Sequence, residues 1–149
     1  MRQLFQHLLV LIINPYFFKE PIAPHIAAEK TGIKIEIEVI KRAFDELTKL
    51  ADIVIVEGAG GFLVPLNEAE TIADLAAVLN IPIILVVGMK LGCINHTLLT
   101  VEAIKARNLM LDGWIANQAE PGMSSCDENV ATIAQRTHLN CMANYPYSL

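Results

Sequence analysis

Three short apolar runs recur along the chain at intervals of about thirty residues, the length of a strand-helix-strand unit. They cover residues 53–56, 83–87 and 114–116, and each is followed by glycines or polar residues. Such a run, bounded by turn-forming residues, is typical of a strand in a parallel sheet that is buried on both faces. The pattern therefore predicts three strands of one parallel sheet.

Helical periodicity fills the intervals between these runs. Apolar residues at positions 72, 75, 76 and 79 share one face of a predicted helix over residues 71–79, and those at 94, 98, 101 and 104 do the same over residues 94–107. We also expect helices over residues 36–50 and 127–137, and a last strand over residues 139–145. With right-handed crossovers, this alternation predicts an α/β fold, a three-layer, doubly wound and mostly parallel sheet, in a single domain over residues 1–149.

The N-terminal part of the chain does not follow this alternation. Residues 8–13 predict a strand, but prolines at positions 15, 21 and 24 predict an irregular segment over residues 14–24. We therefore expect the α/β fold to be incomplete at its N-terminus.

Composition narrows the class of protein. The chain has 149 residues, 54% hydrophobic and 18% charged, which is enough apolar material for one core. The net charge of -5, without a Lys/Arg cluster, argues against nucleic-acid binding. The apolar run near the N-terminus is far shorter than the ~20 residues of a membrane span, so no membrane partner is expected. Three cysteines without a C-x-x-C pair indicate a reducing cytoplasm.

Polar residues follow each of the three apolar runs. Residues 57–61 (EGAGG), 88–95 (GMKLGCIN) and 117–118 (NQ) all come where a strand is predicted to end. In open parallel sheets, ligands bind beyond the carboxyl ends of the strands. The sequence therefore predicts a binding site along one edge of the sheet.

The first of these strand ends carries an acid and three glycines. A carboxylate at the tip of a hydrophobic strand can hold Mg²⁺, which prefers oxygen ligands and shares them with phosphate and water. The glycines Gly58, Gly60 and Gly61 let backbone N–H groups approach a ligand closely. The residues alone leave open an alternative, in which Glu57 is a solvent-exposed strand end and the glycines form a turn.

The second and third strand ends also have two interpretations each. Residues 90–97 (KLGCINHT) predict a glycine turn into a helix whose first N–H groups bind a carboxylate or phosphate. Alternatively, Asn95 or Thr97 caps this helix and Cys93 is a small buried apolar residue. Asn117 offers a donor and an acceptor suited to the edge of adenine, or it satisfies a turn.

Several common catalytic motifs are absent from the sequence. No G-x-x-x-x-G-K-[ST] loop accompanies the predicted Mg²⁺ ligand, and no G-x-S-x-G turn occurs. The four histidines lack the spacing of a zinc motif. We therefore identify no catalytic residue from the sequence.

Four stretches of the chain together resemble one enzyme family. They are NPY.F.EP.APH (14–25), VEGAGG..VPL (56–66), ADL......PIILVVG.KLGCINH..LT..AI (73–104) and L.GWIAN (111–117). Together they resemble the dethiobiotin synthetases over nearly the whole chain. The resemblance implies a P-loop NTPase-like homodimer of the biotin pathway. It implies a cyclo-ligase that forms dethiobiotin from 7,8-diaminopelargonic acid, CO2 or bicarbonate, and ATP with Mg²⁺, through a phosphorylated carbamate.

The resemblance also implies roles for individual residues. By motif, Glu57 corresponds to the Mg²⁺ ligand, and the helix start at residues 92–95 receives the substrate carboxylate across the dimer interface. The residues implied in ATP binding are Glu57, Gly58, Gly60, Asn117 and Pro146, and those implied in substrate binding are Gly60, Gly61, Gly92, Cys93 and Asn95.

The chain also departs from the family pattern. The family opens with a strand and a glycine-rich loop that carries a phosphate-binding lysine, and it continues beyond the proline at position 146. We expect either a dethiobiotin synthetase whose catalysis needs those segments, or a truncated, inactive fragment that still dimerises or binds substrate weakly. The KLGCINH stretch argues against a related P-loop amidoligase or partitioning ATPase.

Overall fold

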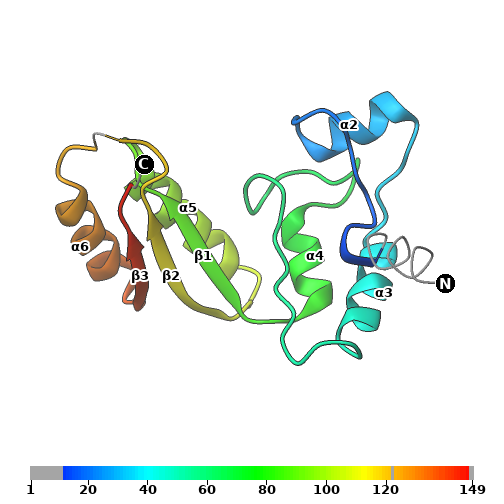
Figure 1. Ribbon diagram of the computed structural model, residues 1–149. Coiled ribbons are helices and arrows are strands. Elements are labelled where there is room, and N and C mark those ends of the chain that lie inside the picture. The colour runs from blue at the N-terminus through cyan, green and yellow to red at the C-terminus, as the bar shows by residue number, and fades with distance from the viewer. Residues whose placement is uncertain (1–11, 122, 148–149) are drawn as a thin grey trace. The chain divides into compact units, whose positions relative to one another are not determined.

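The computed structural model describes residues 12–121 and 123–147 (Figure 1). The chain divides into two compact units, Met1–Leu79 and Asn80–Leu149. The first unit contains helices α2 (Pro24–Thr31), α3 (Ile37–Leu47) and α4 (Ile72–Leu79). The second contains β1 (Ile83–Gly88), α5 (Cys93–Lys105), β2 (Leu111–Asn117), α6 (Cys126–Thr137) and β3 (Cys141–Tyr145).

The second unit is built around a parallel sheet of order β1-β2-β3. β1 and β2 are each followed by a helix, α5 and α6, that returns the chain to the start of the next strand, as the alternating pattern predicts. The predicted α/β class with a parallel sheet is therefore confirmed, and so are the strands predicted at residues 83–87, 114–116 and 139–145. The predicted helices over 94–107 and 127–137 correspond to α5 and α6.

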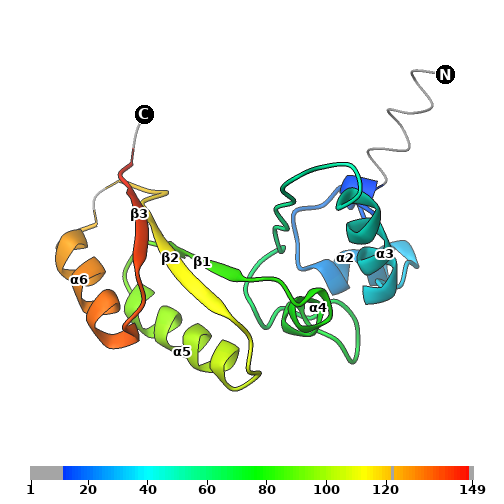
Figure 2. The ribbon, with the colours of Figure 1, turned by 90° about the horizontal axis from the view of Figure 1, so that it is seen from below.

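The core of the second unit lies between the sheet and its two helices. Figure 2 shows α5 and α6 on the same side of the sheet. Val87, Trp114 and Ala116 are buried on this side, where they form one cluster with Cys93 and Ile133. Fully burying a side chain such as Val87 or Ile133 stabilises a fold by roughly 1.5–3 kcal/mol, so this cluster stabilises the unit.

Alternate residues of the strands lie on the opposite side of the sheet and are exposed. Ile84 is 48%, Val86 is 59% and Met142 is 50% exposed. β3 approaches β2 closely at Gly113, where a Cβ atom would lie 2.9 Å from both the Asn140 backbone oxygen and Met142 Cγ. A glycine is required there because no side chain fits between the two strands.

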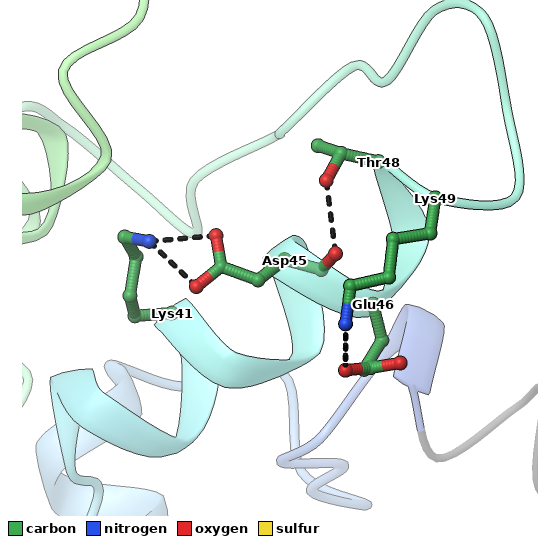
Figure 3. Close-up of polar contacts among 5 residues, drawn as sticks. All are labelled: Lys41, Asp45, Glu46, Thr48 and Lys49. Atoms are coloured by element: carbon green, nitrogen blue, oxygen red, sulfur yellow. Dashed lines mark hydrogen bonds and ion pairs between the residues drawn. The ribbon is translucent and has the colours of Figure 1, made fainter.

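In the first unit, α3 is a strongly amphipathic helix. Its polar face carries ion pairs that Figure 3 shows in detail. Lys41 Nζ lies 2.6 Å from both carboxylate oxygens of Asp45, and Lys49 Nζ lies 2.6 Å from Glu46 Oε1. Thr48 Oγ1 donates to the Asp45 backbone oxygen at 2.9 Å. Pairs of this spacing contribute only about 0.3–0.5 kcal/mol each, so packing of the apolar face holds α3 in place.

A hydrogen-bonded turn precedes α4. Asn67 Oδ1 accepts from the backbone N–H groups of Ala69 and Glu70 at 2.9 Å, and Asn67 Nδ2 donates to the Ile35 backbone oxygen at 2.9 Å. Asp74 caps the helix by accepting from Thr71 N at 2.7 Å and from Thr71 Oγ1 at 2.6 Å. These bonds fix the residues that follow the glycine-rich stretch.

Two sequence predictions in the first unit are wrong. Residues 53–56 form no strand, because no other segment within the described residues offers hydrogen bonds to their backbone. Ile12 and Ile13 have helical backbone instead of the predicted extended one, and the rest of that predicted strand, residues 8–11, lies outside the described residues. The predicted helices over 36–50 and 71–79 are confirmed as α3 and α4.

Helix α2, which the sequence pattern did not predict, begins at the last residue of the segment expected to be irregular. α2 begins at Pro24, which has no N–H to leave unpaired, and it is followed by Gly32 in a left-handed conformation (φ 69°). Proline at a helix start and glycine just beyond its end are a recognised pair of signals, so the sequence did contain the information. Within the described residues, no helix combines the length and apolarity needed to cross a membrane.

Candidate functional site

The carboxyl ends of the three strands in the second unit lie in register. Gly88 of β1 is the partner of Asn117 of β2, which is in turn the partner of Tyr145 of β3. Beyond the strands, Met89 N donates to the Asn117 backbone oxygen at 2.8 Å, and Gln118 N donates to the Tyr145 backbone oxygen at 3.0 Å. The residues predicted at these strand ends therefore share one edge of the sheet.

The first turn of α5 begins a few residues beyond this edge. Gly92 is the N-cap residue and has a left-handed conformation (φ 92°), which favours glycine. Cys93 N donates to the Lys90 backbone oxygen at 2.9 Å, and His96 N donates to the Gly92 backbone oxygen at 3.1 Å. Because no side chain caps this helix, the interpretation of Asn95 or Thr97 as its cap is wrong.

Two backbone N–H groups of this turn remain available to a ligand. Among the described residues, the N–H groups of Ile94 and Asn95 find no hydrogen-bond acceptor. Unpaired N–H groups together with the positive end of the helix dipole attract a carboxylate or a phosphate. Asn95 is exposed beside them, so its side-chain amide can reach the same ligand.

Cys93 plays a packing role in this turn. Its side chain is 3% exposed and belongs to the core cluster with Trp114, which confirms the interpretation of a small buried apolar residue. Its backbone N–H is already bonded to Lys90. Contact between Cys93 and a substrate stays a prediction. The buried side chain and the bonded N–H group of Cys93 do not favour such a contact.

Asn117 combines a fixed backbone with an available side chain. Its backbone oxygen accepts from Met89, while its side-chain amide makes no hydrogen bond within the described part of the chain. The residue is half-buried at the end of β2. Pro146 is exposed and directly follows Tyr145, the strand partner of Asn117. The two residues predicted to contact the base therefore come from neighbouring strand ends.

The glycine-rich stretch of the first unit is a tight turn. Gly60 has a left-handed conformation (φ 87°), and a Cβ atom there would lie 2.9 Å from Val64 Cγ2. A Cβ at Gly58 would lie 3.2 Å from Ile72 Cγ2, whereas Gly61 has open space around it. The Gly61 backbone oxygen accepts from Val64 N at 3.0 Å. The interpretation of these glycines as a turn is confirmed, and their predicted contacts with a ligand stay a prediction.

A cavity of about 240 Å³ lies in the first unit beside this turn. Glu57, Gly58 and Ala59 line it together with apolar side chains of α3 and α4, such as Phe44 and Leu75. Glu57 is exposed and makes no hydrogen bond or ion pair within the described residues. Its carboxylate oxygens are therefore available at the margin of this cavity.

A magnesium ion fits the chemistry of Glu57. Nowhere in the described chain do three His, Cys, Asp or Glu side chains gather to enclose a metal. Mg²⁺ does not need such a cluster, because it is often bound through one or two carboxylates plus water and substrate phosphates. Glu57 and the glycine turn belong to one unit, Asn95 and Asn117 to the other. Their predicted convergence on one ligand stays a prediction.

A titratable thiol lies at the first position of α6. Partial burial raises the pKa of Cys126 above its ordinary value, and the negative charge of Asp127 raises this pKa further. A helix N-terminus normally lowers the pKa of a thiol. The acidic first turn of α6 opposes that effect, so Cys126 is a neutral thiol at neutral pH.

Comparison with known proteins finds similar sequences along nearly the whole chain. The model of a family described as an AAA domain matches residues 3–149. The chain is 53% identical over 135 residues to an ATP-dependent dethiobiotin synthetase of Nitrosospira multiformis, and 52% identical over 135 residues to one of Aromatoleum aromaticum. Each alignment covers 91% of this chain and 60% of the relative.

A third similar protein carries the same name. An ATP-dependent dethiobiotin synthetase of a Janthinobacterium species is 47% identical over 125 residues, which cover 84% of this chain and 53% of the relative. The resemblance inferred from the motifs is thereby confirmed. The chain spans 53–60% of the length of these curated relatives.

Proposed function

This chain belongs to the AAA domain family, and we propose that it works as an ATP-dependent dethiobiotin synthetase. The relatives that carry this name support the proposal through 47–53% identity. The structural observation that carries it is the shared strand edge, where the unpaired N–H groups of Ile94 and Asn95 and the available amide of Asn117 flank β1 and β2. The N–H groups of Ile94 and Asn95 suit a carboxylate, and the side-chain amide of Asn117 suits the edge of a nucleobase.

In this proposal, the first turn of α5 binds the carboxylate of 7,8-diaminopelargonic acid. The N–H groups of Ile94 and Asn95 donate to its oxygens, and Gly92 leaves the approach open because it has no side chain. A long aliphatic acid needs such an anchor at the end remote from its two amines. The anchor lowers the entropy cost of placing those amines for reaction.

ATP is the second ligand in this proposal. The side-chain amide of Asn117 hydrogen-bonds the edge of adenine, and Pro146 packs against the base. Gly58, Gly60 and Gly61 lie on the side of the phosphates. Glu57 holds Mg²⁺, and the bound ion supplies positive charge that neutralises the phosphate oxygens.

The reaction then proceeds by positioning and charge neutralisation. One amine of the substrate adds to CO2 and loses a proton to give a carbamate. A carbamate oxygen attacks the γ-phosphorus of ATP, and ADP leaves. The second amine attacks the carbonyl carbon of the resulting carbamoyl phosphate, phosphate leaves, and the ureido ring closes. Backbone N–H groups near the phosphates stabilise the charge that develops in the second step.

A homodimer and a cytoplasmic location complete this proposal. The dimer follows from the resemblance, in which the start of α5 faces the partner subunit. The cytoplasm follows from the cysteines Cys93, Cys126 and Cys141, all of which are free thiols.

The second candidate is an inactive fragment that keeps part of the binding site. It is favoured by the absence of a G-x-x-x-x-G-K-[ST] loop from the sequence. Incubating the purified chain with diaminopelargonic acid, bicarbonate and Mg·ATP distinguishes the two. Formation of ADP and dethiobiotin in equal amounts supports the synthetase. Saturable binding of diaminopelargonic acid without ADP supports the fragment, and neither binding nor turnover contradicts both.

A further inference from the structure

The cavity beside the glycine turn has a buried apolar part and an exposed acidic part. Its described lining residues all belong to the first unit. Several of them are at most 7% exposed and are here called the cavity floor: Ile35, Leu66, Leu75 and Leu79. Glu57, in contrast, lines the cavity and is exposed. The lining therefore combines an apolar floor in the core of the unit with a carboxylate in contact with solvent.

The charge of this lining has one sign. Among the described residues that line the cavity, Glu57 is the charged one, and the other polar side chains are the neutral Asn14 and Tyr16. Tyr16 Oη already accepts from Glu36 N at 3.1 Å. Because no Lys, Arg or His of the described chain lines the cavity, an anion there would meet a carboxylate and find no cation. The lining therefore favours a ligand with a positively charged head group.

The volume of the cavity sets the size of the apolar part of such a ligand. The cavity holds about 240 Å³. An apolar cavity of about 150 Å³ is large enough to bind benzene, which has six carbon atoms. A linear hydrocarbon chain of about six carbons therefore fits against the floor, with space left for a small head group near Glu57.

We propose that this cavity binds a primary alkylamine, with the hydrocarbon chain against the floor and the ammonium group at the Glu57 carboxylate. The chain leaves water for apolar walls, and this transfer is the main source of affinity. The ammonium group keeps part of its contact with solvent because Glu57 is exposed, so the cost of desolvating it is small. The ion pair selects the amine over an anionic ligand of the same length.

This ligand differs from the substrate of the proposed synthetase. The aliphatic chain of 7,8-diaminopelargonic acid ends in a carboxylate. The side chains of the floor are all aliphatic, so they would leave a carboxylate buried there without a partner, at a large cost in free energy. Binding of a simple alkylamine needs neither ATP nor Mg²⁺, and the proposal does not rest on the proposed function.

An NMR titration of the ¹⁵N-labelled full chain, without ATP and Mg²⁺, tests the proposal. Hexylamine should give saturable shifts at the amides of Gly58 and Leu75, which both line the cavity. Each CH2 group added between butylamine and hexylamine should tighten binding about fourfold, which corresponds to the transfer free energy of one CH2 group. The matched ligand 6-aminohexanoate has the same ammonium group but ends in a carboxylate, so it should not bind measurably.

Two matched variants test the role of the carboxylate. Glu57→Gln keeps the shape of the side chain and removes its charge, so the affinity for hexylamine should fall about threefold, as for an exposed ion pair. The affinity of this variant for the uncharged hexanol should not fall. Glu38→Gln removes the same charge from an exposed residue of α3 that does not line the cavity, and it should change neither affinity. Because both residues are exposed, both variants should keep the thermal melting curve of the wild type.

A third variant tests the position of the hydrocarbon chain. Ala43 is a half-buried residue of α3 that lines the cavity, so Ala43→Leu fills part of it and should weaken binding of both hexylamine and hexanol. The absence of saturable shifts with hexylamine in the wild type would overturn the proposal, and a cavity filled by another part of the chain would give this result. So would shifts confined to the second unit, equal affinity of the wild type and Glu57→Gln for hexylamine, or equal affinity for hexylamine and 6-aminohexanoate.

Discussion

Residues 53–56 and residues 83–87 have almost the same sequence character, but only the second run forms a strand. Both are short, apolar and rich in β-branched residues, and both lead into glycine-containing turns. Residues 83–87 belong to β1 because β2 offers a parallel partner in register over the whole strand. Residues 53–56 have no such partner among the described residues. A strand therefore depends on its neighbour as much as on its own propensity.

The largest expected difference between these regions concerns stability. Trp114 is fully buried against α5 and α6, so Trp114→Ala should lower the free energy of unfolding by about 3–5 kcal/mol. Ile53→Ala, at a residue 80% exposed, should change it by less than about 0.5 kcal/mol. Urea unfolding followed by circular dichroism measures both. A large cost for Ile53→Ala would mean that residues 53–56 are covered within the folded chain.

The glycine turns after the two runs differ in a second way. Gly60 and Gly92 both have left-handed backbone, and an alanine strains either position by about 1–2 kcal/mol. At Gly60 the new Cβ would also collide with Val64, 2.9 Å away, whereas Gly92 has nothing within 4 Å. Gly60→Ala should therefore lower the free energy of unfolding more than Gly92→Ala does. Equal costs would show that Val64 moves aside freely.

Glu57, which follows residues 53–56, and Asn117, at the end of β2, should respond differently to metal. Asn117→Ala removes hydrogen bonds to adenine and should weaken ATP binding about tenfold, with or without Mg²⁺. Glu57→Gln should weaken only the binding of Mg·ATP. Isothermal titration calorimetry with ATP alone and with Mg·ATP separates the two effects, and Asn144→Ala, at an exposed residue of β3, serves as the control. An Asn117→Ala effect that appears only with Mg²⁺ would remove this residue from the base.

The smallest expected effect concerns the reactivity of Cys126, the first residue of α6 in the second unit. Because burial and Asp127 raise the pKa of Cys126, its alkylation by iodoacetamide should begin at higher pH than that of a free thiol. Asp127→Asn removes the second cause and should shift the pH profile toward lower pH. Mass spectrometry of the modified peptide follows the reaction, and an unchanged profile in Asp127→Asn would exclude the carboxylate as a cause.

The sequence predicted the elements whose signals are local. The apolar stripes of α4, α5 and α6 are visible in the spacing of their residues, and these helices begin and end within two residues of the prediction. α2 was missed because prolines at positions 21 and 24 were interpreted as breakers, although Pro24 begins the helix. The strand at residues 53–56 was predicted wrongly, because a local pattern does not contain the identity of the neighbouring strand.

For the candidate site, the sequence predicted which strand ends take part but not the backbone conformation of the helix start. The strand-end rule identified Asn117 and the start of α5, which the structure brings to one edge of the sheet. The pattern did not show that Gly92, and not Asn95, is the N-cap, because that depends on the left-handed backbone of Gly92. It also did not show that the N–H groups of Ile94 and Asn95 are the unpaired ones.

The central claim is that the first turn of α5 binds the carboxylate of the substrate. An NMR titration of the ¹⁵N-labelled chain with 7,8-diaminopelargonic acid tests it most directly, with Asn95→Asp as the matched variant of added negative charge. The account predicts saturable shifts of the Ile94 and Asn95 amides in the wild type and a marked loss of affinity in the variant. Saturable shifts confined to other amides, or equal affinity in both proteins, would contradict it.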